Sequence, residues 1–158
     1  MKKNEEYIVT CIDDTDLNSG VVKIDDMVVF VPNLLIGEKA KIKIVKVNKK
    51  YAFGIITQLL EPSINRQELT CEVAKTCGGC QLQHMKYAYQ LDYKYKHVKK
   101  LFEDIEVKPI LGMDSPWYYR NKAQFPVKIK DGKVQMGFYR QHSNDVVTCK
   151  ECKIQTTL

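Results

Sequence analysis

Apolar and polar positions alternate along residues 7–61, in short runs rich in β-branched and aromatic residues. Runs of period two, separated by acidic, Gly or Asn positions, predict β-strands. The expected strands are residues 7–12, 20–24, 27–31, 39–44 and 51–56, and Asp25-Asp26 predicts a tight turn between the second and the third. About five short strands in a segment of this length predict a small closed barrel of the OB type.

The fourth expected strand alternates lysine with apolar residues, so that Lys39, Lys41 and Lys43 share one face. Lysines continue into the following turn at Lys46, Lys49 and Lys50. A lysine face can keep an edge strand solvated and protect it from pairing. On an OB-like barrel that also carries aromatic residues, the same face can bind RNA. Both interpretations stay open on the sequence pattern.

The periodicity becomes helical after a cysteine-rich loop at residues 65–80. Apolar residues recur at steps of three and four from Tyr87 to Ile105, which predicts a helix from near Gln81 to near Ile105, with the tyrosines of this stripe in the core. Strands are expected again at 117–122, 123–129 and 134–139, with an Asp-Gly hairpin turn at 130–133. The predicted class is therefore mainly β with one long helix (α+β). A small OB-like barrel at 1–62 precedes an α+β cysteine-ligated central domain at 63–158.

The bulk composition is that of an ordinary globular chain, with 158 residues, 44% apolar and 28% charged. No apolar run is long enough to span a membrane and no secretory signal is found, so we expect a soluble, cytoplasmic protein. Residues 1–61 contain nine Lys and nine Asp or Glu, and the net charge of +6 therefore lies in residues 62–158. A positive charge of this size suits a polyanionic partner without requiring one.

Thiols are the most informative side chains. Three lie close together at Cys71, Cys77 and Cys80, and two more follow at Cys149 and Cys152. In a chain without a secretory signal, a soft-metal site is a better interpretation than a disulfide framework. The remaining thiol, at position 11, lies in an expected strand and is interpreted as a small buried hydrophobe.

Spacing alone leaves two metal centres open. The two Cys-x2-Cys pairs suit a tetrahedral zinc ribbon, whereas the three clustered thiols and one distant thiol suit a [4Fe–4S] cluster. Gly78 and Gly79 favour the cluster, because backbone without side chains can approach it closely. A redox role for Cys77-Gly-Gly-Cys80 is weaker, since no thioredoxin-like βαβ pattern surrounds the pair.

Residues 77–84, Cys-Gly-Gly-Cys-Gln-Leu-Gln-His, resemble the cluster loop of the RNA uracil-C5 methyltransferases of the RumA (23S rRNA) type, and Tyr87 and Gln90-Leu91 resemble the helix that follows. Residues 119–123 and 137–155 are similar to strands of that family's central domain. Residues 20–66 are similar to its N-terminal TRAM domain, an OB-type RNA-binding barrel. The resemblance covers essentially the whole chain.

The resemblance implies a [4Fe–4S] cluster held by Cys71, Cys77, Cys80 and Cys152, with Cys149 filling the core. It also implies that the full-length enzyme transfers methyl from S-adenosylmethionine to C5 of a uracil. Nothing here matches the family's Rossmann-like domain that binds S-adenosylmethionine. We therefore expect this chain to be an excised N-terminal region, inactive alone, with the cluster in a structural role. The alternative is a stand-alone zinc-ribbon RNA-binding module.

RNA is the expected partner, 23S rRNA by the resemblance, with no membrane and a monomeric chain. Unstacking a target base costs a few kcal/mol, and binding to the RNA around that base can offset this cost. In the barrel, the expected contacts are Lys39, Lys41, Lys43, Lys46, Lys49 and Lys50 to phosphate, with Tyr51 or Phe53 as stacking surfaces. In the central domain, they are Arg120, Lys122, Arg140 and His142.

Overall fold

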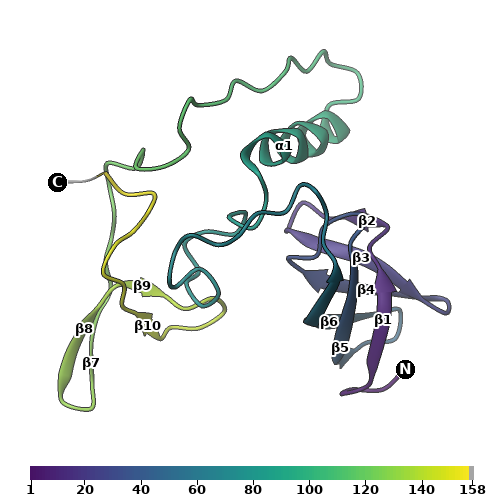
Figure 1. Ribbon diagram of the computed structural model, residues 1–158, viewed down its shortest axis with the longest axis horizontal. Coiled ribbons are helices and arrows are strands. Elements are labelled where there is room, and N and C mark those ends of the chain that lie inside the picture. The colour runs from purple at the N-terminus through teal and green to yellow at the C-terminus, as the bar shows by residue number, and fades with distance from the viewer. Residues whose placement is uncertain (157–158) are drawn as a thin grey trace. The chain divides into compact units, whose positions relative to one another are not determined.

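The computed structural model describes residues 1–156 and divides into two compact units, Met1–Arg66 and Gln67–Leu158. We call these the N-terminal unit and the C-terminal unit (Figure 1). Among the described residues, no helix is both long and apolar enough to cross a membrane.

A single curled sheet makes up most of the N-terminal unit (Figure 1). Its strands lie in the order β1-β5-β6-β4-β3-β2, and the β4–β6 ladder is parallel. The strands are β1 (Glu6–Thr10), β2 (Asp13–Asp14), β3 (Ser19–Ile24), β4 (Met27–Pro32), β5 (Lys39–Val47) and β6 (Tyr51–Glu61). The mainly β class and the OB-like curl are confirmed. The expected closed barrel is a half-barrel instead, because β2 is two residues long and no described ladder joins it to β1.

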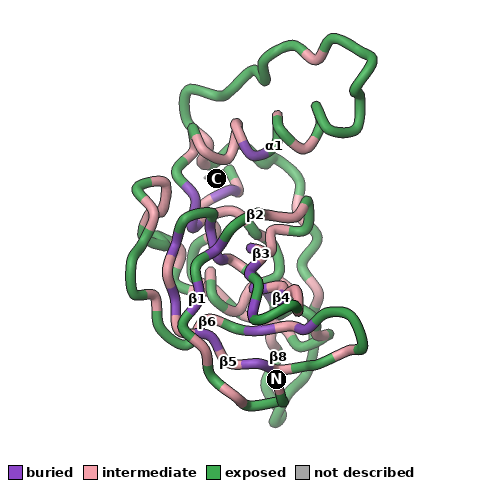
Figure 2. Tube along the Cα trace, turned by 90° about the vertical axis from the view of Figure 1, so that its right-hand side faces the viewer, coloured by how far each residue is buried: buried purple, intermediate pink, exposed green. Residues whose placement is uncertain are grey.

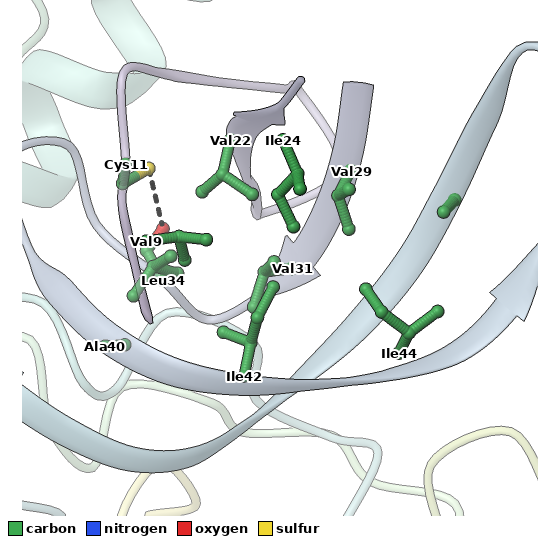
Figure 3. Close-up of a cluster of buried hydrophobic side chains, with 11 residues drawn as sticks. Val9, Cys11, Val22, Ile24, Val29, Val31, Leu34, Ala40, Ile42 and Ile44 are labelled. Atoms are coloured by element: carbon green, nitrogen blue, oxygen red, sulfur yellow. Dashed lines mark hydrogen bonds between the residues drawn. The ribbon is translucent and has the colours of Figure 1, made fainter. Parts of the chain in front are cut away.

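The inner face of the curl carries the core, because β-strand residues alternate between two faces. Val22, Val29, Val31, Ile42 and Ile44 are each 0% exposed, and Figure 3 shows them converging from β3, β4 and β5. Burying such a side chain contributes roughly 1.5–3 kcal/mol. Along these strands, most residues between the buried ones are of intermediate burial, as the colours of Figure 2 show. Packing of these side chains therefore stabilises the curled shape of the sheet.

Cys11 belongs to this core, as its sequence position predicts. It is 2% exposed, and its Sγ lies 3.2 Å from the carbonyl oxygen of Asp13. Burial raises the pKa of the thiol to about 11, although hydrogen bonds with the backbone of Val21 and Asp13 oppose the shift. Gly20 packs directly against this residue, and a Cβ there would lie 2.7 Å from the Cys11 sulfur. The thiol is a buried packing group.

The C-terminal unit contains one helix, α1 (Tyr87–Leu101), and two short hairpins among its described residues. The hairpins pair β7 (Val127–Lys130) with β8 (Lys133–Met136), and β9 (Phe138–Tyr139) with β10 (Val146–Val147). Asp131 and Gly132 both have positive φ, of 51° and 72°, which confirms the Asp-Gly hairpin turn.

The predicted helix is too long at both ends. Residues 82–86 do not begin it, because the backbone N–H and the side-chain amide of Gln67 donate to the carbonyl oxygens of His84 and Gln83, each at 2.9 Å. The helix ends at Leu101, and the N–H of Phe102 closes a turn onto Lys99. These hydrogen bonds hold the flanking backbone in turns.

The predicted apolar stripe of the helix is not a core within this unit. Val98 is 43% exposed and Phe102 47% exposed, and the buried helical residue is Tyr93, which lies off the stripe. Tyr87 and Tyr95 are half-buried. The spacing of apolar residues predicted the helix correctly, but it did not predict which face of the helix is buried.

The predicted strand at 117–122 is wrong. Tyr118 has a φ of 53°, which interrupts an extended run, and Arg120 makes a single bridge with Gln155. The strand expected at 123–129 begins at Val127, after Pro126, which lacks an N–H donor. The strand expected at 134–139 divides at Gly137 into β8 and β9.

One face of the β7–β8 hairpin is apolar and exposed. Val127 opposes Met136 and Ile129 opposes Val134, and these four side chains are 59–77% exposed. The alternate positions carry polar side chains, including Lys128. The hairpin is therefore amphipathic without a covered apolar face among the described residues.

Candidate metal centre and nucleic-acid interface

Five cysteines line one cavity in the C-terminal unit: Cys71, Cys77, Cys80, Cys149 and Cys152. None is in a disulfide. The first three come from the loop before α1, and the other two from the segment after β10. Thiols separated by about 70 positions in the chain thus meet at a single place. Four of them are the expected cluster ligands. The fifth, Cys149, was expected to fill the core and lines the cavity instead.

Hydrogen bonds join the first cysteine segment to the end of β9 and to the second cysteine segment. The N–H of Gly78 donates to the carbonyl oxygen of Tyr139 at 2.9 Å, and Cys77 forms an isolated bridge with Arg140. A Cβ at Gly78 would lie 3.1 Å from that carbonyl oxygen, so the close approach favours glycine. Further along, the N–H of Lys150 donates to Oε1 of Glu72 at 3.0 Å.

The thiols interact electrostatically across the cavity. Burial raises the pKa of Cys80, a hydrogen bond from the Gln83 side chain opposes this, and Cys152, Cys77 and Cys71 raise it further. Burial also raises the pKa of Cys149, and again Cys152 and Cys71 contribute. Several thiolates at these positions would repel one another. A bound cationic centre would remove that repulsion.

The placement of the thiols bears on which metal centre they could hold. Within residues 1–156, no three His, Cys, Asp or Glu side chains lie close enough together to hold one metal ion. A zinc–sulfur bond of about 2.3 Å in a tetrahedron places the ligand sulfurs less than about 4 Å apart. Apolar groups complete the cavity wall, among them Val73, Phe138 and Ile154. Five thiols and an apolar wall thus surround one cavity.

The expected RNA-binding residues of the C-terminal unit lie in three places. Arg120 lines the cysteine cavity, where its N–H donates to the carbonyl oxygen of Ile154 at 2.8 Å. Arg140 and His142 line a separate hollow of about 360 Å³ beside Gly78. Lys122 is exposed, in the segment before β7, and lines neither of these cavities. The structure thus brings two of the four together.

Three aromatic rings meet on the outer face of the curled sheet. The ring centroids of Phe30 and Phe53 lie 5.9 Å apart, those of Phe30 and Tyr51 5.8 Å, and those of Tyr51 and Phe53 5.5 Å. The parallel ladder between β4 and β6 pairs Phe30 with Phe53. Lys46 of β5 is paired with Phe53 on the other side. We call Phe30, Tyr51 and Phe53 the aromatic trio.

The lysines of the N-terminal unit differ in their partners. Lys39 lies 3.0 Å from Glu61 and Lys41 lies 2.7 Å from Glu6, so both form ion pairs on the outer face of β5. Lys43 is paired across the ladder with Ile55. Lys49 and Lys50 lie in the turn between β5 and β6. Two of the six predicted phosphate contacts thus have carboxylate neighbours that would compete with RNA.

Comparison with known proteins identifies this unit. Residues 3–57 match the family model of the TRAM domain. The aromatic trio lies within the matched residues, and the curled sheet β1–β6 extends a few residues beyond them, to Glu61.

Relatives match beyond the TRAM domain, over 98% of the chain. Identity is 44% to an uncharacterized RNA methyltransferase of Halalkalibacterium halodurans, 40% to one of Clostridium tetani and 43% to one of Bacillus cereus. The chain spans 35% of the length of each of these proteins. The resemblance to RNA methyltransferases is confirmed at this level. The cysteine loop and the central segment are part of the matched region.

Two features of the N-terminal unit were not predicted from the sequence. Phe30 completes the aromatic trio; alternation in β4 places it on the outer face, but the parallel pairing with β6 gives no sequence signal. Glu38 is 0% exposed and lies in an ion pair with Arg66. Burial would raise the pKa of Glu38, but hydrogen bonds from Arg66 and from the N–H groups of Leu35 and Ser63 outweigh it and lower the pKa.

Proposed function

We propose that this chain is the N-terminal RNA-binding and iron–sulfur region of an S-adenosylmethionine-dependent RNA uracil-C5 methyltransferase that acts on 23S rRNA. One observation carries the proposal: five cysteines from two distant segments surround one cavity in a chain that also contains a TRAM domain. The names of the relatives support the methyltransferase part.

The donor set fits a [4Fe–4S] cluster with Cys71, Cys77, Cys80 and Cys152 as ligands. Thiolates are the usual ligands of such clusters. Three clustered cysteines and one distant cysteine around the same cavity support a group of several metal atoms. A bound cluster supplies a covalent link between the loop before α1 and the segment after β10. Its proposed role is structural, since closing so long a loop is costly in entropy.

A zinc ribbon remains the second candidate, because Cys149 lines the same cavity as the other four cysteines. It would use the two Cys-x2-Cys pairs, which include Cys149 and leave Cys71 out. Iron and zinc analysis after anaerobic purification separates the two, since the cluster gives about four iron atoms per chain and absorbance near 400 nm.

RNA binding is assigned to the outer face of the curled sheet. Aromatic rings stack on bases whatever their sequence, and nearby lysines contact phosphate. The aromatic trio supplies the rings, and Lys46, beside Phe53 in the ladder, supplies an adjacent cation. Arg140 and His142 add a second contact region beside the cysteine loop.

Fluorescence anisotropy with a labelled 23S rRNA stem–loop tests the proposal. The apparent affinity should fall steeply with salt, because bound phosphates release counterions. The triple variant Lys46→Gln, Lys49→Gln, Lys50→Gln should weaken binding and reduce the salt slope. A charge-matched control, Lys128→Gln, Lys130→Gln, Lys133→Gln on the β7–β8 hairpin, should bind as the wild type does. Equal losses in both variants, or affinity independent of salt, would refute the assignment.

A further inference from the structure

A second hollow in the C-terminal unit lies next to the cysteine cavity. It has a volume of about 350 Å³ and is lined by the cysteine loop, the first turns of α1, the segment 113–120 and Ile154. Cys80, Gln83 and Arg120 line both this hollow and the cysteine cavity. Its size falls in the usual range of small-molecule sites, about 300–1,000 Å³. We call it the aromatic pocket.

Hydrogen bonds fix the walls of the aromatic pocket. The N–H of Met113 donates to the hydroxyl oxygen of Tyr87 at 2.8 Å, which ties the segment after α1 back to the helix. On the opposite side, the N–H of Tyr118 donates to Lys153 and the N–H of Thr156 donates to Arg120, each at 2.9 Å. These contacts flank Tyr119, which lines the pocket. These hydrogen bonds therefore hold both walls of the pocket in place.

The lining combines three kinds of group that bind nucleotides. Tyr87, Trp117 and Tyr119 are aromatic, Lys94 and Arg120 are cationic, and Gln83 is an amide. Planar rings stack on an exposed base, cations contact its phosphates, and amides hydrogen-bond to its edge. A purely apolar groove could stack on a base but could not contact its phosphates or hydrogen-bond to its edge.

Gln83 indicates what the ligand must supply. Its side chain hydrogen-bonds to Cys80, while its Oε1 is buried and has no hydrogen-bond partner among the described residues. A buried acceptor without a partner costs free energy, so a ligand that brings an N–H donor is favoured. The edges of nucleobases carry such donors.

We propose that the aromatic pocket binds a single unstacked base of the RNA, with Tyr119 or Trp117 against its face, Gln83 at its edge, and Lys94 and Arg120 at the adjoining phosphates. This inference rests on the proposed RNA-binding function and adds a base-binding site in the C-terminal unit. In this proposal, the segment 113–120 contributes to base binding, a role separate from holding the metal centre.

Trp117 is the one tryptophan of the chain, so its fluorescence reports on this pocket directly. The full chain, purified anaerobically, is titrated with single-stranded oligouridylate of 12 nucleotides and with an abasic ribose-phosphate chain of equal length and charge. Anisotropy of a 5′ label measures total binding in the same samples. Oligouridylate should change Trp117 emission in a saturable way, and the abasic chain should leave it unchanged.

Tyr119→Ala should weaken oligouridylate binding at least about tenfold, in keeping with the loss of one stacked base. Tyr119 lines the aromatic pocket without lining the cysteine cavity, so iron content should be unchanged. Tyr118→Phe is the matched control, since Tyr118 lines neither cavity and its hydroxyl contacts Glu151. Gln83→Leu should also weaken binding of oligouridylate.

The outcomes separate the pocket from the proposed function. Salt-sensitive RNA binding with unchanged Trp117 emission and full affinity in Tyr119→Ala would overturn the pocket and leave the proposed function standing. Equal emission changes with the abasic chain would also overturn it, since phosphate alone would then be bound. Failure of both the stem–loop and oligouridylate to bind would refute the proposed function itself. A response to a tyrosine-containing peptide and not to RNA would assign the pocket to a protein ligand.

Discussion

Glu38 and Arg66, 28 residues apart in the chain, form an ion pair in which Nη2 of Arg66 lies 2.6 Å from Oε2 of Glu38. The same carboxylate accepts hydrogen bonds from the N–H groups of Leu35 at 2.9 Å and Ser63 at 3.1 Å. Nη2 of Arg66 also donates to the carbonyl oxygen of Asn33 at 2.6 Å. One buried carboxylate thus joins the loop before β5 to the segment after β6.

Arg66→Met should destabilise the N-terminal unit by about 3–5 kcal/mol, because it leaves a buried carboxylate without its cation. Native-state hydrogen exchange of the amides in β3–β6 measures the free energy of unfolding of this unit. Lys41→Met, which breaks the exposed pair with Glu6, is the control and should change it little. Equal effects of the two substitutions would show that burial of Glu38 does not determine the cost.

The Glu38 pair should also make stability depend on pH on the acid side. The pKa of Glu38 in the folded chain lies below its ordinary value of 4.5. Its contribution is therefore complete above that value and is lost as the pH falls through it toward the folded pKa. In urea titrations from pH 7 to pH 3, the gap between wild type and Glu38→Gln should narrow as the pH falls. A gap that is constant over this range would contradict the assignment.

Single cysteine substitutions should divide into two classes. Cys71→Ser and Cys152→Ser each remove a proposed cluster ligand, so iron content and absorbance near 400 nm should fall strongly. Cys149→Ser should retain both, although Cys149 lines the cavity. Cys11→Ser, in the core of the N-terminal unit, is the control for general destabilisation. Loss of metal in Cys149→Ser with retention in Cys71→Ser would favour zinc instead.

Alanine at the aromatic trio should weaken RNA binding through lost stacking. Phe53→Ala and Tyr51→Ala should each cost about 1–3 kcal/mol of binding free energy for each base that stacks there. Binding to the 23S rRNA stem–loop, measured by anisotropy, checks this. Ile8→Ala, at an exposed apolar position on β1, is the matched control and should bind normally. Unchanged affinity in the trio variants would move the RNA site elsewhere.

The strands of the N-terminal unit were predicted closely from the sequence. The period-two pattern predicted each strand from β3 to β6 within a few residues, because one face of each strand is buried in a core such as that formed by Val29 and Ile42. The parallel pairing that brings Phe30 to Phe53 could not be predicted, since it depends on a contact between strands that are not adjacent in the chain.

The C-terminal unit was harder to predict, because few of its residues form ladders. Spacing located the cysteines but could not choose between Cys149 and Cys152, which both line the cavity. The helical period identified α1, yet hydrogen bonds from Gln67 to residues 83 and 84 moved its start. Hydrogen bonds between residues so far apart in the chain cannot be predicted from local sequence patterns. The positive φ of Tyr118 likewise has no signal in a run of aromatic residues.

The β7–β8 hairpin has a practical consequence for anyone who handles this chain. A two-stranded ribbon with no covered apolar face is marginally stable in water. Lys128, Lys130 and Lys133 are exposed on this ribbon. Brief digestion with trypsin should therefore cut here well before it cuts at Lys41 or Lys43 within the six-stranded sheet, and would remove the adjoining strands that hold the cysteine loop.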